Sequence, residues 1–239
     1  MRAMILAAGR GERMRPLTDR TPKPLLQAGG KPLIVWHIER LVHAGIADLV
    51  INHAHLGKQI EQALGDGSRY GAHIEYSDEG TALETAGGIA FAQHLLGDAP
   101  FVVVNGDVYC DYDFSHLPQR AAALANSGDM AHLVLVDNPE HNLKGDFCLA
   151  GDRIVATPRI PDPKFQILTF SGIGLYKSAL FANITRGSKA PLAPLLREQI
   201  ALNRISGEHH RGLWMDIGTP QRLVELDKQL HASQNAGHV

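Results

Sequence analysis

The chain has 239 residues, 44% of them hydrophobic, so it is long enough to bury a substantial core and short enough to be a single domain. Its 23 basic and 25 acidic residues give a formal charge of -2, and no block of like charges favours binding to a nucleic acid or an anionic membrane. Two cysteines without metal-ligand spacing, and the lack of a signal-like segment or an apolar run of about 20 residues, lead us to expect a cytoplasmic protein that acts on small molecules.

Short apolar runs alternate with amphipathic stretches through the first half of the chain. Strands are expected at residues 3–7, 48–52, 73–77 and 101–105, with helices from Pro32 to Gly45, at 56–64 and at 85–96. This alternation predicts a mostly parallel sheet with helices on both faces. In such sheets, ligands bind beyond the carboxyl ends of the strands.

The second half has shorter elements. We expect a helix at 118–126, a strand at 131–136, two strands around 147–155 and a strand near 169–176. Helices around 192–202 and 220–232 follow, and residues 233–239 are expected to fray. No linker or repeat divides the sequence, which favours one domain over residues 1–239.

The loop after the first expected strand is rich in glycine and arginine, with the sequence LAAGRGERMRPL at residues 6–17. Glycines allow backbone N–H groups to turn towards phosphate oxygens, and arginines add charge-assisted hydrogen bonds. The loop is not a P-loop, because no Lys-Ser or Lys-Thr pair follows, and a dinucleotide fingerprint would need glycine at Met14. Taken alone, this composition is equally consistent with a solvated turn.

Three further residues indicate phosphate and metal chemistry. Lys23 lies between two prolines, which are expected to hold the backbone extended and project its ammonium towards a phosphate. Asp107 follows an apolar strand at the expected ligand edge, and Asp216 lies among apolar residues where a carboxylate needs a partner. Two carboxylates with phosphates and water suit Mg²⁺, although an exposed lysine and a turn-capping aspartate would also fit these patterns.

Five motifs occur in order along the chain: LAAGxGxRM at residues 6–14, PKP at 22–24, LxTAGG at 83–88, NGD at 105–107 and DIGTP at 216–220. Together they resemble the motifs of sugar-1-phosphate nucleotidyltransferases over nearly the whole chain. The resemblance implies an α/β, Rossmann-like fold of GT-A type, with three αβα layers around a mostly parallel mixed sheet. Residues of about 1–110 would form the nucleotide-binding half and residues of about 111–232 the sugar-phosphate-binding half.

The resemblance also implies roles for individual residues. The catalytic residues would be Arg15 at the departing pyrophosphate, Lys23 at the α-phosphate, and Asp107, which with Asp216 would hold Mg²⁺. Nucleotide binding would involve Ala8, Gly9, Gly11, Glu12, Arg13, Lys23, Glu79, Ala82 and Gly88. The sugar phosphate would be bound by Asn105, Glu140, Gly145, Ser171 and Gly172. The attacking phosphate oxygen is already anionic, so no general base is required and the 13 histidines are assigned no role.

Length narrows the choice within the family, because the chain lacks the hexapeptide repeats and insertions of longer relatives. With GTALETAGG at 80–88 and NxxGDF at 142–147, it looks most like uridylyltransferases that transfer UMP from UTP to N-acetylmuramate 1-phosphate in peptidoglycan recycling. Mannose-1-phosphate guanylyltransfer and a non-catalytic nucleotide-sensing subunit are the alternatives, and we expect a monomer or small homo-oligomer. Two features depart from the family pattern: Glu12 replaces the frequent Ser or Thr, and ATPR at 156–159 replaces Glu-Lys-Pro near the sugar.

Overall fold

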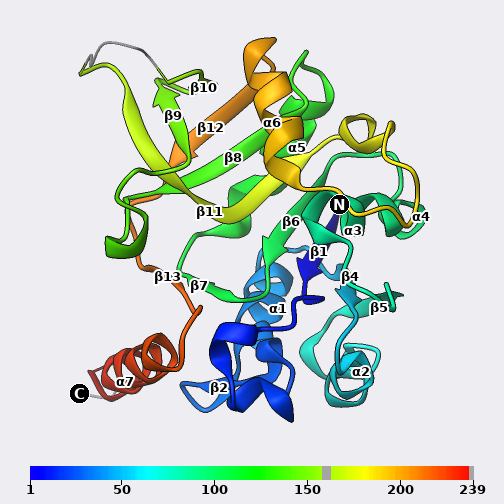
Figure 1. The fold of residues 1–239 in the computed structure, drawn as a ribbon, viewed down its shortest axis with the longest axis vertical. Coiled ribbons are helices and arrows are strands. Elements are labelled where there is room, and N and C mark those ends of the chain that lie inside the picture. The colour runs from blue at the N-terminus through cyan, green and yellow to red at the C-terminus, as the bar shows by residue number, and fades with distance from the viewer. Residues whose placement is uncertain (158–162, 237–239) are drawn as a thin grey trace.

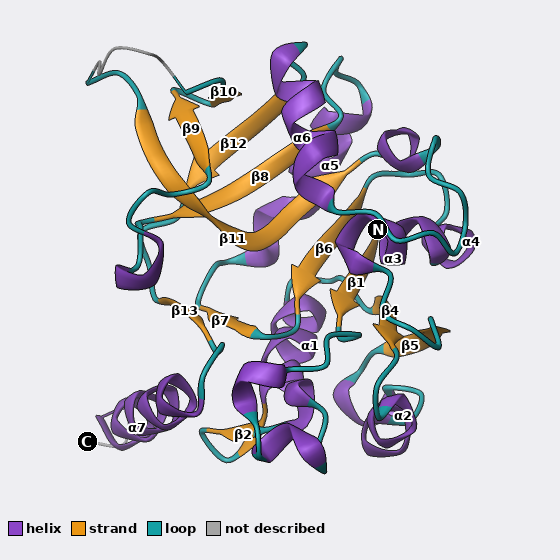
Figure 2. Ribbon diagram, in the orientation of Figure 1, coloured by secondary structure: helices purple, strands orange, loops and turns teal. Residues whose placement is uncertain are grey.

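A nine-stranded sheet forms the middle layer of the protein, in the order β5-β4-β1-β6-β11-β8-β12-β10-β9 (Figures 1 and 2). The structure is a computed structural model that describes residues 1–157 and 163–236. The apolar runs of the first half form β1 (Arg2–Leu6), β4 (Asp48–His53), β5 (His73–Asp78) and β6 (Phe101–Asn105), as predicted. These strands pair in parallel, so their carboxyl ends meet at one edge of the sheet.

The second half of the sheet consists of β8 (Ala131–Val136), β9 (Phe147–Ala150), β10 (Arg153–Val155), β11 (Gln166–Tyr176) and β12 (Ile205–His209). The sheet is mixed and mostly parallel, as expected, because β10 and β11 run against the other strands. In the described residues of this half, β8 and β12 pair in parallel, while β11 runs antiparallel to β6, β8 and β9, and β10 runs antiparallel to β9 and β12. The connections between β9, β10 and β11 are too short for the crossover helix that parallel strands require.

Helices cover both faces of the sheet, which gives the three expected layers (Figure 2). One face packs against α1 (Leu33–His43), α2 (Gly57–Leu64) and α5 (Leu117–Ala125). The other packs against α3 (Glu84–Phe91), α4 (Gln93–Leu96) and α6 (Leu192–Ala201). The single helix expected at 85–96 is broken at Ala92, where Leu95 bonds to a carbonyl three residues back.

The C-terminal helix α7 (Pro220–Ala236) packs on the N-terminal part of the chain, beside the hairpin of β2 (Gln27–Ala28) and β3 (Lys31–Pro32) (Figure 1). Its buried leucines, Leu223, Leu226 and Leu230, share an apolar cluster with Met14 of the glycine-rich loop. The helix continues to Ala236, beyond residue 233, where fraying was expected to begin. Residues 237–239 lie outside the described part. Its leucine stripe therefore fixes the loop that precedes it by some 200 residues in sequence.

A small ladder of β7 (Val108–Cys110) and β13 (Trp214–Asp216) lies beside the main sheet and was not predicted. Each strand is too short to show a hydrophobic period of its own. Of the ATPR segment, Pro158 and Arg159 lie outside the described residues. Within the described residues, no helix has the length and apolar character needed to span a membrane.

Candidate active site

Polar side chains stand at the carboxyl edge of the parallel strands, on either side of β1. Leu6, the last residue of β1, is paired with Asn52 on β4 and with Asn105 on β6. Both asparagines therefore lie at the level where the strands end, which is the expected ligand edge. Gly106 follows at once and approaches closely, since a Cβ there would lie 2.7 Å from the carbonyl oxygen of Leu6. Glycine is required for this close approach of two chains.

Three adjoining hollows form one continuous cleft along this edge. The central hollow is lined by Leu6, Ala7, Ala8, Gly9, Lys23, Pro24, Asn52, Glu79, Ala82, Glu84, Thr85, Asn105 and Asp107. The loop hollow shares Gly9, Lys23 and Asp107 with it and adds Gly11, Glu12, Arg13, Met14 and Gly218. The α6 hollow shares Glu84, Thr85 and Asn105 with the central hollow and adds Asp146, Phe147, Phe170, Pro191, Leu192, Ala193, Leu196 and Arg197.

Hydrogen bonds and buried contacts hold the glycine-rich loop in place. Gly11 has a φ of +65°, and its carbonyl accepts hydrogen bonds from Met14 N and the buried Thr18 hydroxyl, each at 2.8 Å. A Cβ at Gly11 would lie 2.9 Å from Thr18 Cγ2, so both the backbone conformation and the space favour glycine. Met14 is fully buried against α7. The loop is thus preformed, with Arg13 close to Gly218 at its far end.

Lys23 and Asp107 form an ion pair where the central and loop hollows meet. Lys23 Nζ lies 2.6 Å from Asp107 Oδ2, and the lysine side chain is only 8% exposed against 41% for the aspartate. The expected extended backbone is confined to Pro22, because Lys23 opens a short 3₁₀ turn that continues to Leu25. The lysine therefore contributes a buried positive charge at the floor of the cleft, with the carboxylate as its accessible partner.

Asp216 is brought beside Asp107 by the β7–β13 ladder. It is paired with Val108, and the next residue, Ile217, donates its N–H to the carbonyl of Asp107 at 3.0 Å. Asp216 Oδ2 lies 2.8 Å from Arg222 Nη1 and 3.3 Å from His141 Nε2. Asp107 lines the cleft, and Asp216 lies next to it through the ladder although it is not a lining residue. Two neighbouring carboxylates fit a divalent cation that also binds phosphate oxygens and water.

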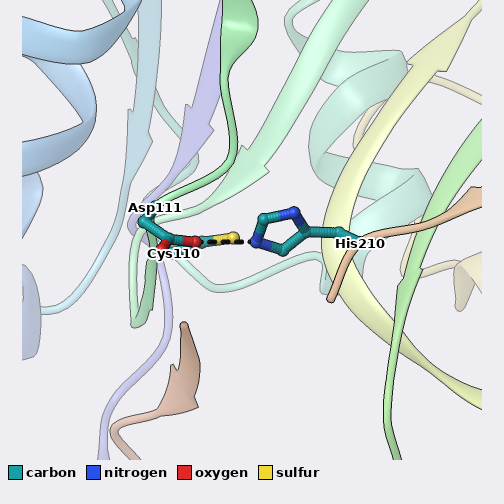
Figure 3. Close-up of side chains that lie close together, drawn as sticks. All are labelled: Cys110, Asp111 and His210. Carbon is teal, nitrogen blue, oxygen red and sulfur yellow. Dashed lines mark hydrogen bonds and ion pairs between the residues drawn. The ribbon is translucent and has the colours of Figure 1, made fainter. Parts of the chain in front are cut away.

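One other group of candidate ligands, Cys110, Asp111 and His210, lies close together outside the cleft (Figure 3). His210 Nε2 is 2.8 Å from Asp111 Oδ1, which is a sufficient partner for both groups. Burial raises the pKa of the Cys110 thiol to about 12, so without a bound metal the thiol is protonated. The pair instead links β7 to the segment before β13, where Asp111 N also bonds to Leu213 O at 3.0 Å.

Glu79 lines the central hollow and is held there by hydrogen bonds from two other segments of the chain. Its Oε1 accepts a 2.6 Å hydrogen bond from Asn52 Nδ2, and its Oε2 accepts one of 2.9 Å from Leu83 N. Burial raises the pKa of Glu79, against the effect of these hydrogen bonds. Gly88 does not line the hollow but makes room for the wall, since a Cβ there would lie 2.4 Å from Glu79 Oε1.

The structure places some of the residues expected at the sugar phosphate in the cleft and others outside it. Asn105 lines the cleft, and Gly172, with a φ of +81°, packs against its side chain. Ser171 is fully buried, and its hydroxyl donates to Val134 O and accepts from Ile173 N, so it stabilises β11 rather than facing the cleft. Glu140 begins the short 3₁₀ helix Glu140–Asn142, and Gly145 precedes the lining residue Asp146, but neither is among the residues that line the three hollows.

Arg15 also lies apart from the cleft residues. Its side chain is 61% exposed and pairs with Asp19 at 3.1 Å. By contrast, several cleft residues were missed, including Asn52, which binds both Ala7 N (2.9 Å) and Glu79. A signal for Asn52 was present, because it ends an apolar strand as Asn105 does. Arg222 and His141, the partners of Asp216, carry no such local signal.

Comparisons with known proteins agree on one family. The sequence profile described as "Nucleotidyl transferase" matches residues 2–145. The chain is 58% identical to the N-acetylmuramate alpha-1-phosphate uridylyltransferase of Neisseria meningitidis serogroup B, over 94% of this chain and 96% of that protein. It is 34% identical to the protein of the same name from Caulobacter vibrioides, over 95% and 96% of the two chains.

More distant proteins differ in length or are similar in fold only. The mannose-1-phosphate guanyltransferase of Hypocrea jecorina is 32% identical over 94% of this chain, but the match covers only 62% of that protein. A solved structure of a protein from Bacillus anthracis superposes with a TM-score of 0.78 at 23% identity, covering 96% of this chain and 95% of that one. Its fold is therefore shared by this chain.

Proposed function

Because the chain belongs to the nucleotidyl transferase family, we propose that its cleft transfers UMP from UTP to N-acetylmuramate 1-phosphate and releases pyrophosphate. The observation that carries the choice of substrates is the 58% identity to a uridylyltransferase of that specificity over nearly the full length of both chains. The longer guanyltransferases match less well, at 32% identity. The reaction would serve peptidoglycan recycling in the cytoplasm.

The three hollows suggest how the substrates divide the cleft. The triphosphate of UTP would follow the loop hollow, which is lined by Gly9, Gly11 and Arg13. The uracil would enter the central hollow beside Glu79 and Ala82, and the sugar would extend past Asn105 into the α6 hollow. In a fold of GT-A type, residues of about 1–110 would then hold the nucleotide and residues of about 111–232 most of the sugar phosphate, within one domain.

Lys23 and Asp107 stand where these substrates would meet, at the α-phosphate. The Lys23 ammonium would neutralise charge that grows on the α-phosphate oxygens, and the rigid loop would align the two phosphates for in-line attack. The attacking oxygen of the sugar phosphate is already ionised, so no side chain needs to accept a proton. Asp107 and Asp216 would hold Mg²⁺, which when bound supplies further positive charge to the phosphates.

The test is pyrophosphate release by the purified protein with magnesium, using UTP, GTP, CTP and dTTP. Each nucleotide is paired with the 1-phosphates of N-acetylmuramate, N-acetylglucosamine, mannose and glucose. We expect the highest kcat/KM with UTP and the muramyl substrate. A preference for GTP with mannose 1-phosphate would replace the proposed substrates, and no turnover with any pair would favour a nucleotide-sensing protein.

A further inference from the structure

The α6 hollow contains one cation among mostly apolar and acidic lining residues. Its walls are formed by two phenylalanines from the sheet, Phe147 and Phe170, and by Leu192 and Leu196 of α6. Arg197, the next residue of α6, lines the same hollow. Such a lining suits a sugar, whose C–H faces pack on aromatic rings, with a charged group placed at one end.

Three charged residues, Glu84, Asp146 and Arg197, line this hollow, and of these Asp146 has hydrogen-bond partners among the described residues. Asp146 accepts hydrogen bonds from Asn142 Nδ2 at 3.1 Å and from Phe170 N at 2.9 Å, so its carboxylate is occupied by its own turn. Arg197 is exposed and forms no hydrogen bond or ion pair with any residue in the described ranges 1–157 and 163–236. The guanidinium is thus free to bind an anion that enters the hollow.

We propose that Arg197 binds the lactyl carboxylate of N-acetylmuramate and so selects this sugar over N-acetylglucosamine. The inference rests on the proposed function and deepens it. N-acetylmuramate is N-acetylglucosamine with a lactyl ether that ends in a carboxylate, so its 1-phosphate carries two anionic groups. The phosphate would lie near Asn105, where the central and α6 hollows join, and the ether would extend into the α6 hollow.

Arginine is suited to this task because its planar guanidinium binds a carboxylate through two parallel hydrogen bonds. Because Arg197 is exposed, its guanidinium is accessible to a ligand that enters the hollow. The other cations that line the cleft are Lys23, which pairs with Asp107, and Arg13, which lines the loop hollow. Both lie at the phosphate end, and neither lines the α6 hollow.

The test compares Arg197→Gln with the wild-type protein, with Arg197→Lys, and with Glu198→Gln as a control on the adjacent residue of α6. For each, the KM and kcat for N-acetylmuramate 1-phosphate and for UTP are measured. The dissociation constants of the N-acetylmuramate and N-acetylglucosamine 1-phosphates are measured by calorimetry, so that the comparison does not depend on turnover. Thermal unfolding of each variant checks that the fold is retained.

For Arg197→Gln we expect the KM and dissociation constant of the muramyl substrate to rise by at least about tenfold, as for other charge-assisted hydrogen bonds. Binding of N-acetylglucosamine 1-phosphate and the KM for UTP should change by less than about twofold, Arg197→Lys should be intermediate, and Glu198→Gln should match the wild type. Equal effects on both sugars, or no effect, would overturn this role while leaving the proposed function intact. A wild-type protein that does not use the muramyl substrate would overturn the proposed function itself.

Discussion

Asn52 joins the end of β1 to the wall of the central hollow, and its replacement tests whether that wall depends on one hydrogen-bonded pair. Its Oδ1 accepts from Ala7 N at 2.9 Å, and its Nδ2 donates to Glu79 Oε1 at 2.6 Å. Asn52→Asp keeps the shape and the acceptor for Ala7 N. It replaces the donor with an oxygen that faces the Glu79 carboxylate, so an attraction becomes a repulsion.

The size of the effect follows from the distance. Two carboxylates about 4 Å apart repel by about 4 kcal/mol at an effective dielectric constant of 20. The pair lowers this by sharing a proton, which is easier because burial already raises the pKa of Glu79. We therefore expect Asn52→Asp to lose about 2–3 kcal/mol of stability at pH 8 and less at pH 5, since the repulsion is present only above the raised pKa. The KM for UTP should rise at least about tenfold.

Urea unfolding at the two pH values and UTP-dependent kinetics measure these effects. Adding Glu79→Gln to Asn52→Asp should restore most of the stability, because the new amide can donate to the new carboxylate and still accept from Leu83 N. Asn183→Asp, at an exposed side chain with no hydrogen bond to any of the described residues, is the matched control and should change stability by less than about 0.5 kcal/mol. The reasoning fails if Asn52→Asp is as stable as the wild type at pH 8, or if the double change is no better than the single one.

Three further predictions concern other parts of the structure. Asp107→Asn should lower kcat/KM by about 100-fold or more while the circular dichroism spectrum is unchanged, because the carboxylate is accessible rather than part of the core. Gly88→Ala should raise the KM for UTP by about tenfold but not that for the sugar phosphate, because its Cβ would lie 2.4 Å from Glu79 Oε1; Gly128→Ala, with open space around it, is the control. Burial lowers the pKa of His37 to about 4, so as the pH falls the unfolded chain binds this proton before the folded protein does. The wild type should therefore lose stability between pH 7 and pH 5. Urea unfolding should show that His37→Gln loses about 2 kcal/mol less over this range than the wild type.

Elements with a strong local pattern were predicted well, and elements defined by distant partners were not. The strands β1, β4, β5 and β6 can be recognised in the sequence, because each is a short apolar run between turns. β12 has the sequence ISGEH, with little hydrophobic pattern, and forms because β8 offers a parallel edge. Its position depends on pairing across some 70 residues, which a local window does not contain.

The residues of the candidate site also differ in whether a local sequence pattern predicts them. Gly9, Gly11, Lys23 and Asp107 lie in motifs whose residue types suggest their chemistry, and they line one cleft. Arg197 shows no signal at all in the sequence. It belongs to a helix that only the three-dimensional fold brings to the cleft, and an exposed arginine on a helix is most often solvated.

The two ion pairs of the cleft suggest how it accepts a triphosphate and a cation together. Lys23 with Asp107, and Arg222 with Asp216, each combine a cation and a carboxylate beside the loop hollow. When phosphates pair with the two cations, the carboxylates lose their partners and become able to bind Mg²⁺, so each ligand should strengthen binding of the other. Calorimetric titration with UTP, with and without magnesium, tests this coupling. We expect at least about tenfold tighter binding with the metal and a smaller gain in Asp216→Asn, whereas equal affinity with and without magnesium would show that the pairs do not exchange partners.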